Sequence, residues 1–190
     1  MTATAPNQIH LTLPGEWIEI DPREPDVLGA LLQAAAVPQE SAQVASALLA
    51  PLAVRLSRLS AAADLVLAGF YSELIPLEGS EDPFLVSANV TLALSPPIGD
   101  LAQLRELLGG DDVEVAPVEL PAGSAVLVSG TTQVDDEGWD GPQPARLRRY
   151  FVPVPGMSRV AALSFLTPNL DLADQFDEVF DAIAATLSFS

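Results

Sequence analysis

The sequence predicts an α+β protein in which an antiparallel sheet of five to seven strands is flanked by helices, as in an α/β/α sandwich. Three observations support this fold class. Apolar residues recur every three to four positions in a helical region at about residues 25–60. At least five segments rich in β-branched and aromatic residues follow it. One amphipathic helix then ends the chain, so helices are available to cover the sheet.

The N-terminal segment contains two short strand-like stretches. Ile9, Leu11 and Leu13 alternate with polar residues, which is the period of a strand with one buried face. Pro14-Gly15 turns the chain, and residues 16–20 then predict a second strand or an extended edge.

The region at 25–60 is expected to hold two helices. Residues 27–37 are helical by composition, and Pro38 ends this helix. A second helix begins at Pro38, since proline is tolerated in a first turn, and runs to about residue 60. Pro51 lies inside it and should kink or split it, because proline removes a backbone donor.

The pattern changes to strands near residue 65. Residues 65–75 and 84–94 are rich in β-branched and aromatic residues and predict an antiparallel pair. The link between them holds prolines, a glycine and several acids, which is typical of a loop. A short amphipathic helix follows at 98–108, and Gly109-Gly110 ends it.

Four further strands are predicted after this helix. Residues 113–118 form the first, and Pro117 assigns it to the edge of the sheet because proline cannot donate to a neighbour. Residues 124–134 form the second. Residues 145–154 and 159–166 form a hairpin with a tight turn between them.

The last helix is the clearest element of the sequence. One apolar stripe runs along it, made of Leu172, Phe176, Val179, Phe180, Ile183 and Leu187. The acids of the segment lie mostly off this stripe, and those in the first turns suit the helix dipole. Burying such a stripe contributes about 1.5–3 kcal/mol per large side chain, so we expect this helix to pack on the sheet.

Several sequence words near the C-terminus carry a resemblance. They are Tyr150-Phe151-Val152-Pro153 with Pro155-Gly156, Leu163-Ser164-Phe165-Leu166-Thr167-Pro168, and residues 176–187. Together with Leu13-Pro14-Gly15-Glu16-Trp17, they resemble actinobacterial LpqN-like proteins with a PsbP-like fold. The resemblance implies a central antiparallel sheet between helices and a role as an adaptor or binding module. Fold alone, however, is a poor guide to function.

The charge of the chain narrows the classes of partner. Twenty-six acids face eight bases, all arginine, which gives a net charge of −18. This excess disfavours nucleic acid and anionic membranes as partners, because binding phosphate needs clustered cations. It would steer a basic protein toward the surface. A plain role in solubility explains the same charge.

The residue types that are missing limit the chemistry and the compartment. The chain has no cysteine, which removes disulfides, thiol nucleophiles and the attachment point of a lipoprotein anchor. Its start lacks the basic and apolar regions of a secretory signal. We expect a cytoplasmic protein with a single domain over residues 1–190, no cofactor and no membrane association.

No catalytic constellation stands out in the sequence. His10 is the only histidine, and it has no neighbouring serine elbow or second metal ligand. Residues 135–141 are rich in acids and glycine, but their spacing does not match a calcium loop, so an acidic hairpin tip is the preferred interpretation. We therefore assign no catalytic residue and no metal ligand.

Six residues are candidates for contact with a partner. Arg146, Arg148 and Tyr150 share one face of a predicted strand, and such a face suits an acidic loop or a carboxylate. Internal pairing of these arginines with the abundant acids is the preferred interpretation, since surface ion pairs of this kind are common. The other three lie on the acidic tip: Trp139, Asp135 and Asp136. A tryptophan exposed there would be a typical binding anchor.

These observations favour a non-enzymatic binding or adaptor protein that engages a basic protein partner through an acidic surface. An immunity protein or a secretion-associated factor would be concrete versions of this role. Two alternatives remain open: a carboxylate-based enzyme or small-ligand protein, and a homodimer formed through a sheet face or edge.

Overall fold

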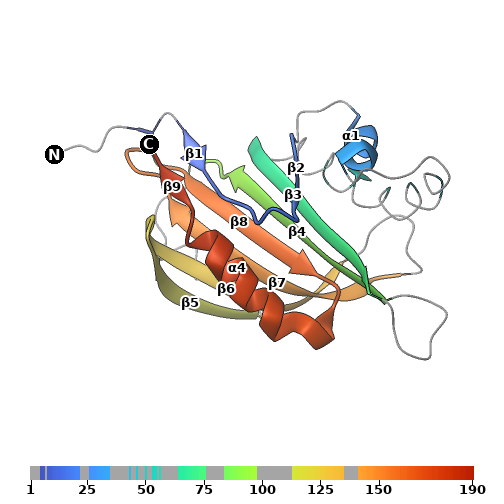
Figure 1. The fold of residues 1–190 in the computed structure, drawn as a ribbon. Coiled ribbons are helices and arrows are strands. Elements are labelled where there is room, and N and C mark those ends of the chain that lie inside the picture. The colour runs from blue at the N-terminus through green and yellow to red at the C-terminus, as the bar shows by residue number, and fades with distance from the viewer. Residues whose placement is uncertain are drawn as a thin grey trace.

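The structure is a computed structural model. It describes residues 5–6, 8–21, 26–34, 64–75, 84–97, 113–134 and 141–190, and the single positions 43, 46, 50, 53, 54 and 56. Within these residues the chain has the predicted α+β class. A seven-stranded antiparallel sheet, a small two-stranded sheet and helices packed on the large sheet make up the fold (Figure 1).

The large sheet combines a hairpin with a four-stranded meander. The order of its strands is β2-β3-β4-β8-β7-β6-β5, and each strand is antiparallel to its neighbours. The bounds are β2 (Ile18–Ile20), β3 (Asp64–Ile75), β4 (Phe84–Leu94), β5 (Val113–Leu120), β6 (Gly123–Val134), β7 (Gln143–Pro153) and β8 (Val160–Thr167). The pairs β3–β4 and β7–β8 confirm the two predicted hairpins. Strand β5 lies at the edge, as its proline predicts.

Tight turns set the register of the meander. Leu120 pairs with Gly123, so only two residues separate β5 from β6, and Gly123 adopts a φ of 126° that favours glycine. Between β7 and β8, the amide of Val154 donates to the carbonyl of Arg159 at 3.0 Å, and Gly156 has a φ of 70°. These short connections keep sequential strands adjacent in the sheet.

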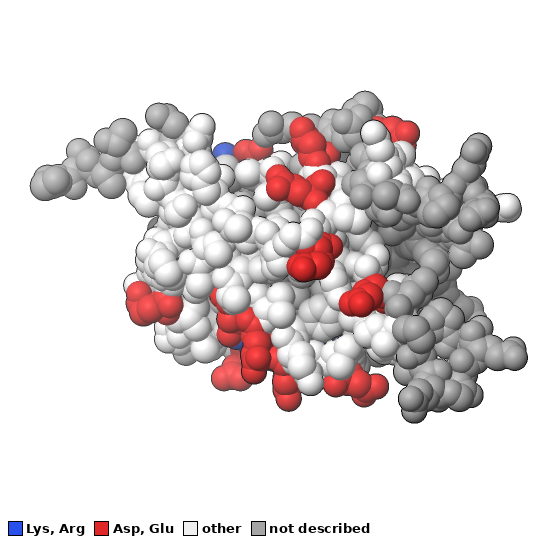
Figure 2. Space-filling view, viewed as in Figure 1, with Lys and Arg blue, Asp and Glu red and all other residues white. Residues whose placement is uncertain are grey.

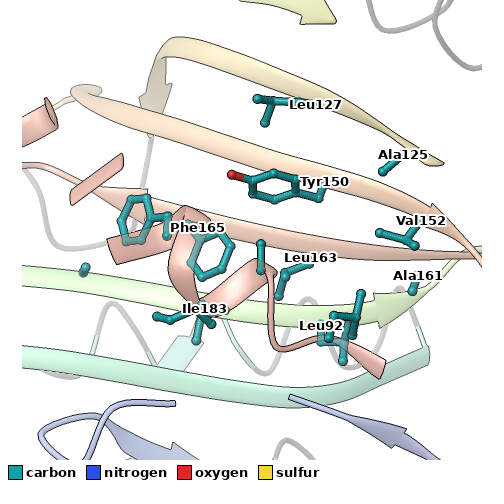
Figure 3. Packing of buried hydrophobic residues seen from close by; sticks show 14 of the residues in the cluster. Leu92, Ala125, Leu127, Tyr150, Val152, Ala161, Leu163, Phe165 and Ile183 are labelled. Atoms are coloured by element: carbon teal, nitrogen blue, oxygen red, sulfur yellow. The ribbon is translucent and has the colours of Figure 1, made fainter. Parts of the chain in front are cut away.

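Helix α4 (Ala173–Ala184) covers one face of the sheet, as the apolar stripe predicts (Figure 1). A 3₁₀ turn, η2 (Leu170–Leu172), precedes it. Phe180 of α4 is completely buried and stacks on Phe165 of β8, with ring centroids 4.7 Å apart. Figure 3 shows the core side chains of β6, β7 and β8 turned toward this helix. The main core therefore lies between α4 and the sheet.

The N-terminal segment runs over the same face beside α4 (Figure 1). Strand β1 (Ile9–His10) pairs antiparallel with β9 (Ser188–Phe189), which follows the helix. Leu13 then packs on the sheet so closely that a Cβ at Gly69 of β3 would lie 2.6 Å from its Cδ1. Glycine at that position lets the segment approach, and this places the following loop at the end of α4.

A second cluster lies on the opposite face near the β2 edge. Helix α1 (Val27–Ala34) contributes Val27 and Leu31, which pack with Ile20 and Ala68. Successive residues of a strand point to opposite faces of the sheet. Gly69 lies on the face that carries α4, so its neighbour Ala68 and this cluster lie on the opposite face. The described helices therefore contact both faces of the sheet.

Several predicted elements differ from the structure. The strand expected at 9–13 was too long, since only Ile9–His10 pairs and the residues after it pack on the sheet face instead. Strand β9 was missed. Val179 was assigned to the buried stripe, but it is 38% exposed. The second helix of the 25–60 region and the helix at 98–108 lie largely or wholly outside the described residues, although the six single positions are helical.

No helix in the described part of the chain is both long and apolar enough to cross a membrane.

Candidate functional site

The predicted contact residues of β7 face α4. Arg146, Arg148 and Tyr150 alternate along the strand and therefore share one side of it. Two acids of α4, Asp177 and Asp181, lie one helical turn apart and meet them. The acids that pair with these arginines are thus on the last helix.

The contacts form one continuous network. The Nε of Arg146 lies 3.2 Å from both carboxylate oxygens of Asp177. Arg148 donates to Asp177 at 3.1 Å and to both oxygens of Asp181 at 2.7 Å. The hydroxyl of Tyr150 donates to Asp181 and accepts from the Nε of Arg148 at 2.9 Å. Such bidentate, charge-assisted bonds fix both position and orientation.

Burial shows what this network does. Tyr150 is 2% exposed, and burial together with its hydrogen bond to Asp181 raises the pKa of its hydroxyl. Burial lowers the pKa of the Arg148 guanidinium, but its bonds to Tyr150 and Asp181 outweigh this and the net shift is upward. The network fastens α4 to β7. Nothing in this geometry supports the role of the three residues as contacts, which stays a prediction.

The other three predicted contact residues lie outside the described residues. They are Trp139, Asp135 and Asp136. Their proposed role stays a prediction from the sequence.

The structure instead places an open groove at one end of α4. Its volume is about 550 Å³, and three distant parts of the chain line it. Glu16 and Trp17 come from the loop before β2, Tyr71 and Glu73 from β3, and Phe176 and Val179 from α4. We call this feature the Trp17 groove. Its volume is within the range of small-ligand sites.

Aromatic rings form the wall of the Trp17 groove. The ring of Tyr71 lies between the other two, with its centroid 6.0 Å from Trp17 and 6.4 Å from Phe176. The contact with Phe176 is edge-to-face, which is a favourable arrangement for two rings. The wall continues into the main core, because Phe176 also contacts the buried Phe180.

The polar side chains of the groove include two acids, Glu16 and Glu73, the phenol of Tyr71 and the amide of Gln175. The Tyr71 hydroxyl donates to Oε2 of Glu73 at 2.6 Å. This hydrogen bond, followed by burial and the charges of Glu73 and Glu16, raises the pKa of Tyr71 to about 12. Tyr71 is therefore a hydrogen-bond donor at neutral pH, and its proton is held too tightly for acid–base chemistry there.

The face around α4 is acidic. Figure 2 shows red patches spread over it and very little blue. Asp171, Asp174 and Glu178 are exposed on η2 and α4, and none of them forms an ion pair with a described arginine. The four described arginines all have partners within the fold: Arg146, Arg148, Arg149 and Arg159. The outward charge of the described surface is thus negative.

His10 lies where the two termini pair. Its Nε2 is 3.1 Å from the Oγ of Ser190, and both residues are exposed. The contact belongs to the β1–β9 pairing. Among the residues that the structure describes, no group of three or more histidine or acidic side chains has the arrangement of a metal site.

Sequence reasoning missed the Trp17 groove. Its lining combines residues 14–17 and 172–179 with residues 71–75 of β3 and Val86 of β4, which no local pattern connects. The available signal was the alternation of Tyr71 and Glu73, which places a phenol and a carboxylate on the same strand face.

Comparisons with known proteins give a distant structural likeness. No family model and no curated protein matches the chain. Among solved structures, the chain is similar to the crystal structure of LpqN, a protein of Mycobacterium tuberculosis involved in cell envelope biogenesis. The sequence identity is 12% and the TM-score is 0.44, and the match covers 100% of this chain and 90% of the other. This is a distant structural relation only.

Proposed function

We propose that the protein is a non-enzymatic binding or adaptor module that engages a basic protein partner through its acidic surface. The observation that carries this proposal is the different placement of basic and acidic side chains. Every described arginine is engaged inside the fold, whereas acids of η2 and α4 are exposed. A surface whose outward charges are of one sign attracts a partner of the other sign.

Binding agrees better than catalysis with the Trp17 groove. Its titratable phenol, Tyr71, keeps its proton up to a pH of about 12, so it is a poor base near neutrality. The remaining lining is mainly aromatic and aliphatic. Such a lining suits the apolar part of a bound molecule. This lining supports our proposal that recognition takes place at this end of α4.

The proposal keeps the cytoplasm as the compartment and an immunity or secretion-associated role as its concrete versions. Membership of the LpqN-like family is part of the proposal as well, and it rests on the sequence words at 150–168 and 176–187.

Affinity capture from the source organism at low salt, followed by calorimetry with the purified partner, tests this function. We expect a partner with a net positive charge, and an affinity that falls as salt is raised because screening weakens the attraction. Repeated capture of no protein, or an affinity that does not change with salt, would contradict the proposal.

A further inference from the structure

Exposed apolar side chains line the Trp17 groove, and Phe84 extends this apolar surface beyond it. Ile75 and Phe84 are directly paired across β3 and β4, and they are 38% and 36% exposed. Val179 of α4 is equally exposed on the other side. These three residues belong to the small set of large apolar side chains that the described surface exposes. A contiguous apolar surface of this kind is typical of a protein interaction site.

The shape of this surface favours a chain segment as its occupant. The groove is open, and apolar side chains extend from it toward the end of the β3–β4 hairpin. A small molecule is normally enclosed over most of its surface, whereas a peptide lays one face along a groove and leaves the other in solvent. An amphipathic segment would cover Ile75, Phe84 and Val179 together.

The charge at the groove selects the sign of that segment. Glu16 and Glu73 are the ionisable carboxylates of the lining, and no described arginine lines it. One oxygen of Glu73 accepts from Tyr71, so its second oxygen remains for a donor from outside. Trp17 and Tyr71 also line the groove, and aromatic rings attract a guanidinium or ammonium group.

We infer that the Trp17 groove is the docking site for an amphipathic peptide segment of the partner, with a bulky apolar side chain against Trp17, Tyr71 and Phe176 and a flanking arginine or lysine on Glu16 and Glu73. This inference rests on the proposed function and specifies the part of the acidic surface that gives specificity. The acids of α4 outside the groove then supply attraction at long range.

Calorimetry with synthetic peptides and two variants tests the site. The probe is an amphipathic peptide of leucine and lysine, and the control peptide has each leucine replaced by serine at the same charge. Val179→Arg places a cation and added bulk in the groove, at an exposed position that does not require refolding of the core. Glu178→Arg changes more charge on the neighbouring exposed position but leaves the lining intact.

We predict that V179R lowers the affinity for the leucine–lysine peptide by about tenfold or more, as expected for a central contact. E178R should weaken it by about threefold or less, as expected for a charge at the rim. The serine control peptide should bind weakly to all three proteins. Three results would each overturn the inferred docking site: equal losses of affinity in V179R and E178R, equal binding of the two peptides, or no binding of the leucine–lysine peptide to the wild type. A salt-sensitive basic partner could still be captured in any of those cases, so the two proposals fail separately.

Discussion

The two tyrosines of the chain make the same type of hydrogen bond in two different places. Tyr150 donates to Asp181 inside the network that joins α4 to β7. Tyr71 donates to Glu73 at the wall of the Trp17 groove. Both pKa values are raised: that of Tyr71 mainly by its hydrogen bond to Glu73, and that of Tyr150 mainly by burial, to which its hydrogen bond to Asp181 adds. No tyrosine in the folded protein is therefore expected to titrate normally.

Phenolate absorbance measured against pH tests this expectation. In the folded protein neither tyrosine should titrate near pH 10, and Tyr71 should titrate near pH 12. In denaturant both should titrate near pH 10, the usual value. Because the folded pKa values are raised, the stability that they contribute is complete below pH 10 and is lost as the pH rises through the folded values.

Glu73→Gln provides the matched control for this titration. Removing the carboxylate should lower the pKa of Tyr71 toward its usual value, because the bond to Glu73 is the largest cause of the shift. Tyr150 should be unaffected. A normal titration of either tyrosine in the folded wild type, or a Tyr71 pKa that does not respond to E73Q, would contradict the assigned hydrogen bonds.

Arg148→Met separates a structural role of the β7 network from a role in binding. Methionine keeps the apolar stem but removes the donors to Asp177, Asp181 and Tyr150. We expect the free energy of unfolding to fall by about 1–2 kcal/mol, a reduced value because half of the Asp181 side chain is exposed. Chemical denaturation measures the loss, with the exposed Glu178→Gln as control. A variant with unchanged stability that no longer binds the peptide would contradict the structural role and support Arg148 as a contact residue.

At the scale of elements, side chains of Thr167 and Asn169 hold the junction after β8 against β4. Asn169 is 8% exposed, and its side chain bonds to the backbone of β4 as a neighbouring strand would. Its amide donates to the carbonyl of Leu85 at 2.8 Å, and its carbonyl accepts from the amide of Ser87 at 2.8 Å. These bonds continue the pairing of β4 with β8 beyond Thr167, the last residue of β8. They also hold Asn169, the residue before η2, against β4.

Asn169→Ala should therefore destabilise the protein by about 2–4 kcal/mol, since two backbone groups lose their partners. Urea unfolding measures this loss. Amide hydrogen exchange gives the local readout: protection of Ser87 should be lost, whereas protection of Val90, deeper in the same strand, should follow only the global stability. Unchanged protection of Ser87 would show that Asn169 does not hold β4.

The elements also show why sequence predicted the fold better than the site. Strands β3, β4, β7 and β8 were predicted within one or two residues, because alternation and turn residues are local signals. The edge position of β5 followed from Pro117 alone. Strand β9 was missed because two residues carry no periodicity, and it exists only through its pairing with β1.

The last helix shows the limit of periodicity most clearly. Its stripe predicted the buried Phe176, Phe180 and Ile183 correctly. Val179 fits the same spacing but lies at the margin of the stripe, where nothing among the described residues covers it. Spacing cannot tell a buried margin from an exposed one, because this depends on which other segments reach that margin.

At the scale of the whole molecule, the proposed function gives charge and apolar surface separate roles. The net charge of −18 attracts any basic protein, so it gives speed of association but little specificity. Specificity requires a shaped apolar contact, and the Trp17 groove is such a contact within the described surface. It joins residues 16–17, 71–75 and 172–179, and only the complete fold brings these together.

Chemical-shift mapping on isotope-labelled protein, titrated with the leucine–lysine peptide and then with a captured partner, tests the central claim most directly. We predict that the largest changes occur at the Trp17 indole and at the amides of Tyr71, Glu73 and Val179, with smaller changes on the exposed acids of α4. Changes confined to β5 or to the face away from α4, with the Trp17 groove unaffected, would contradict the account.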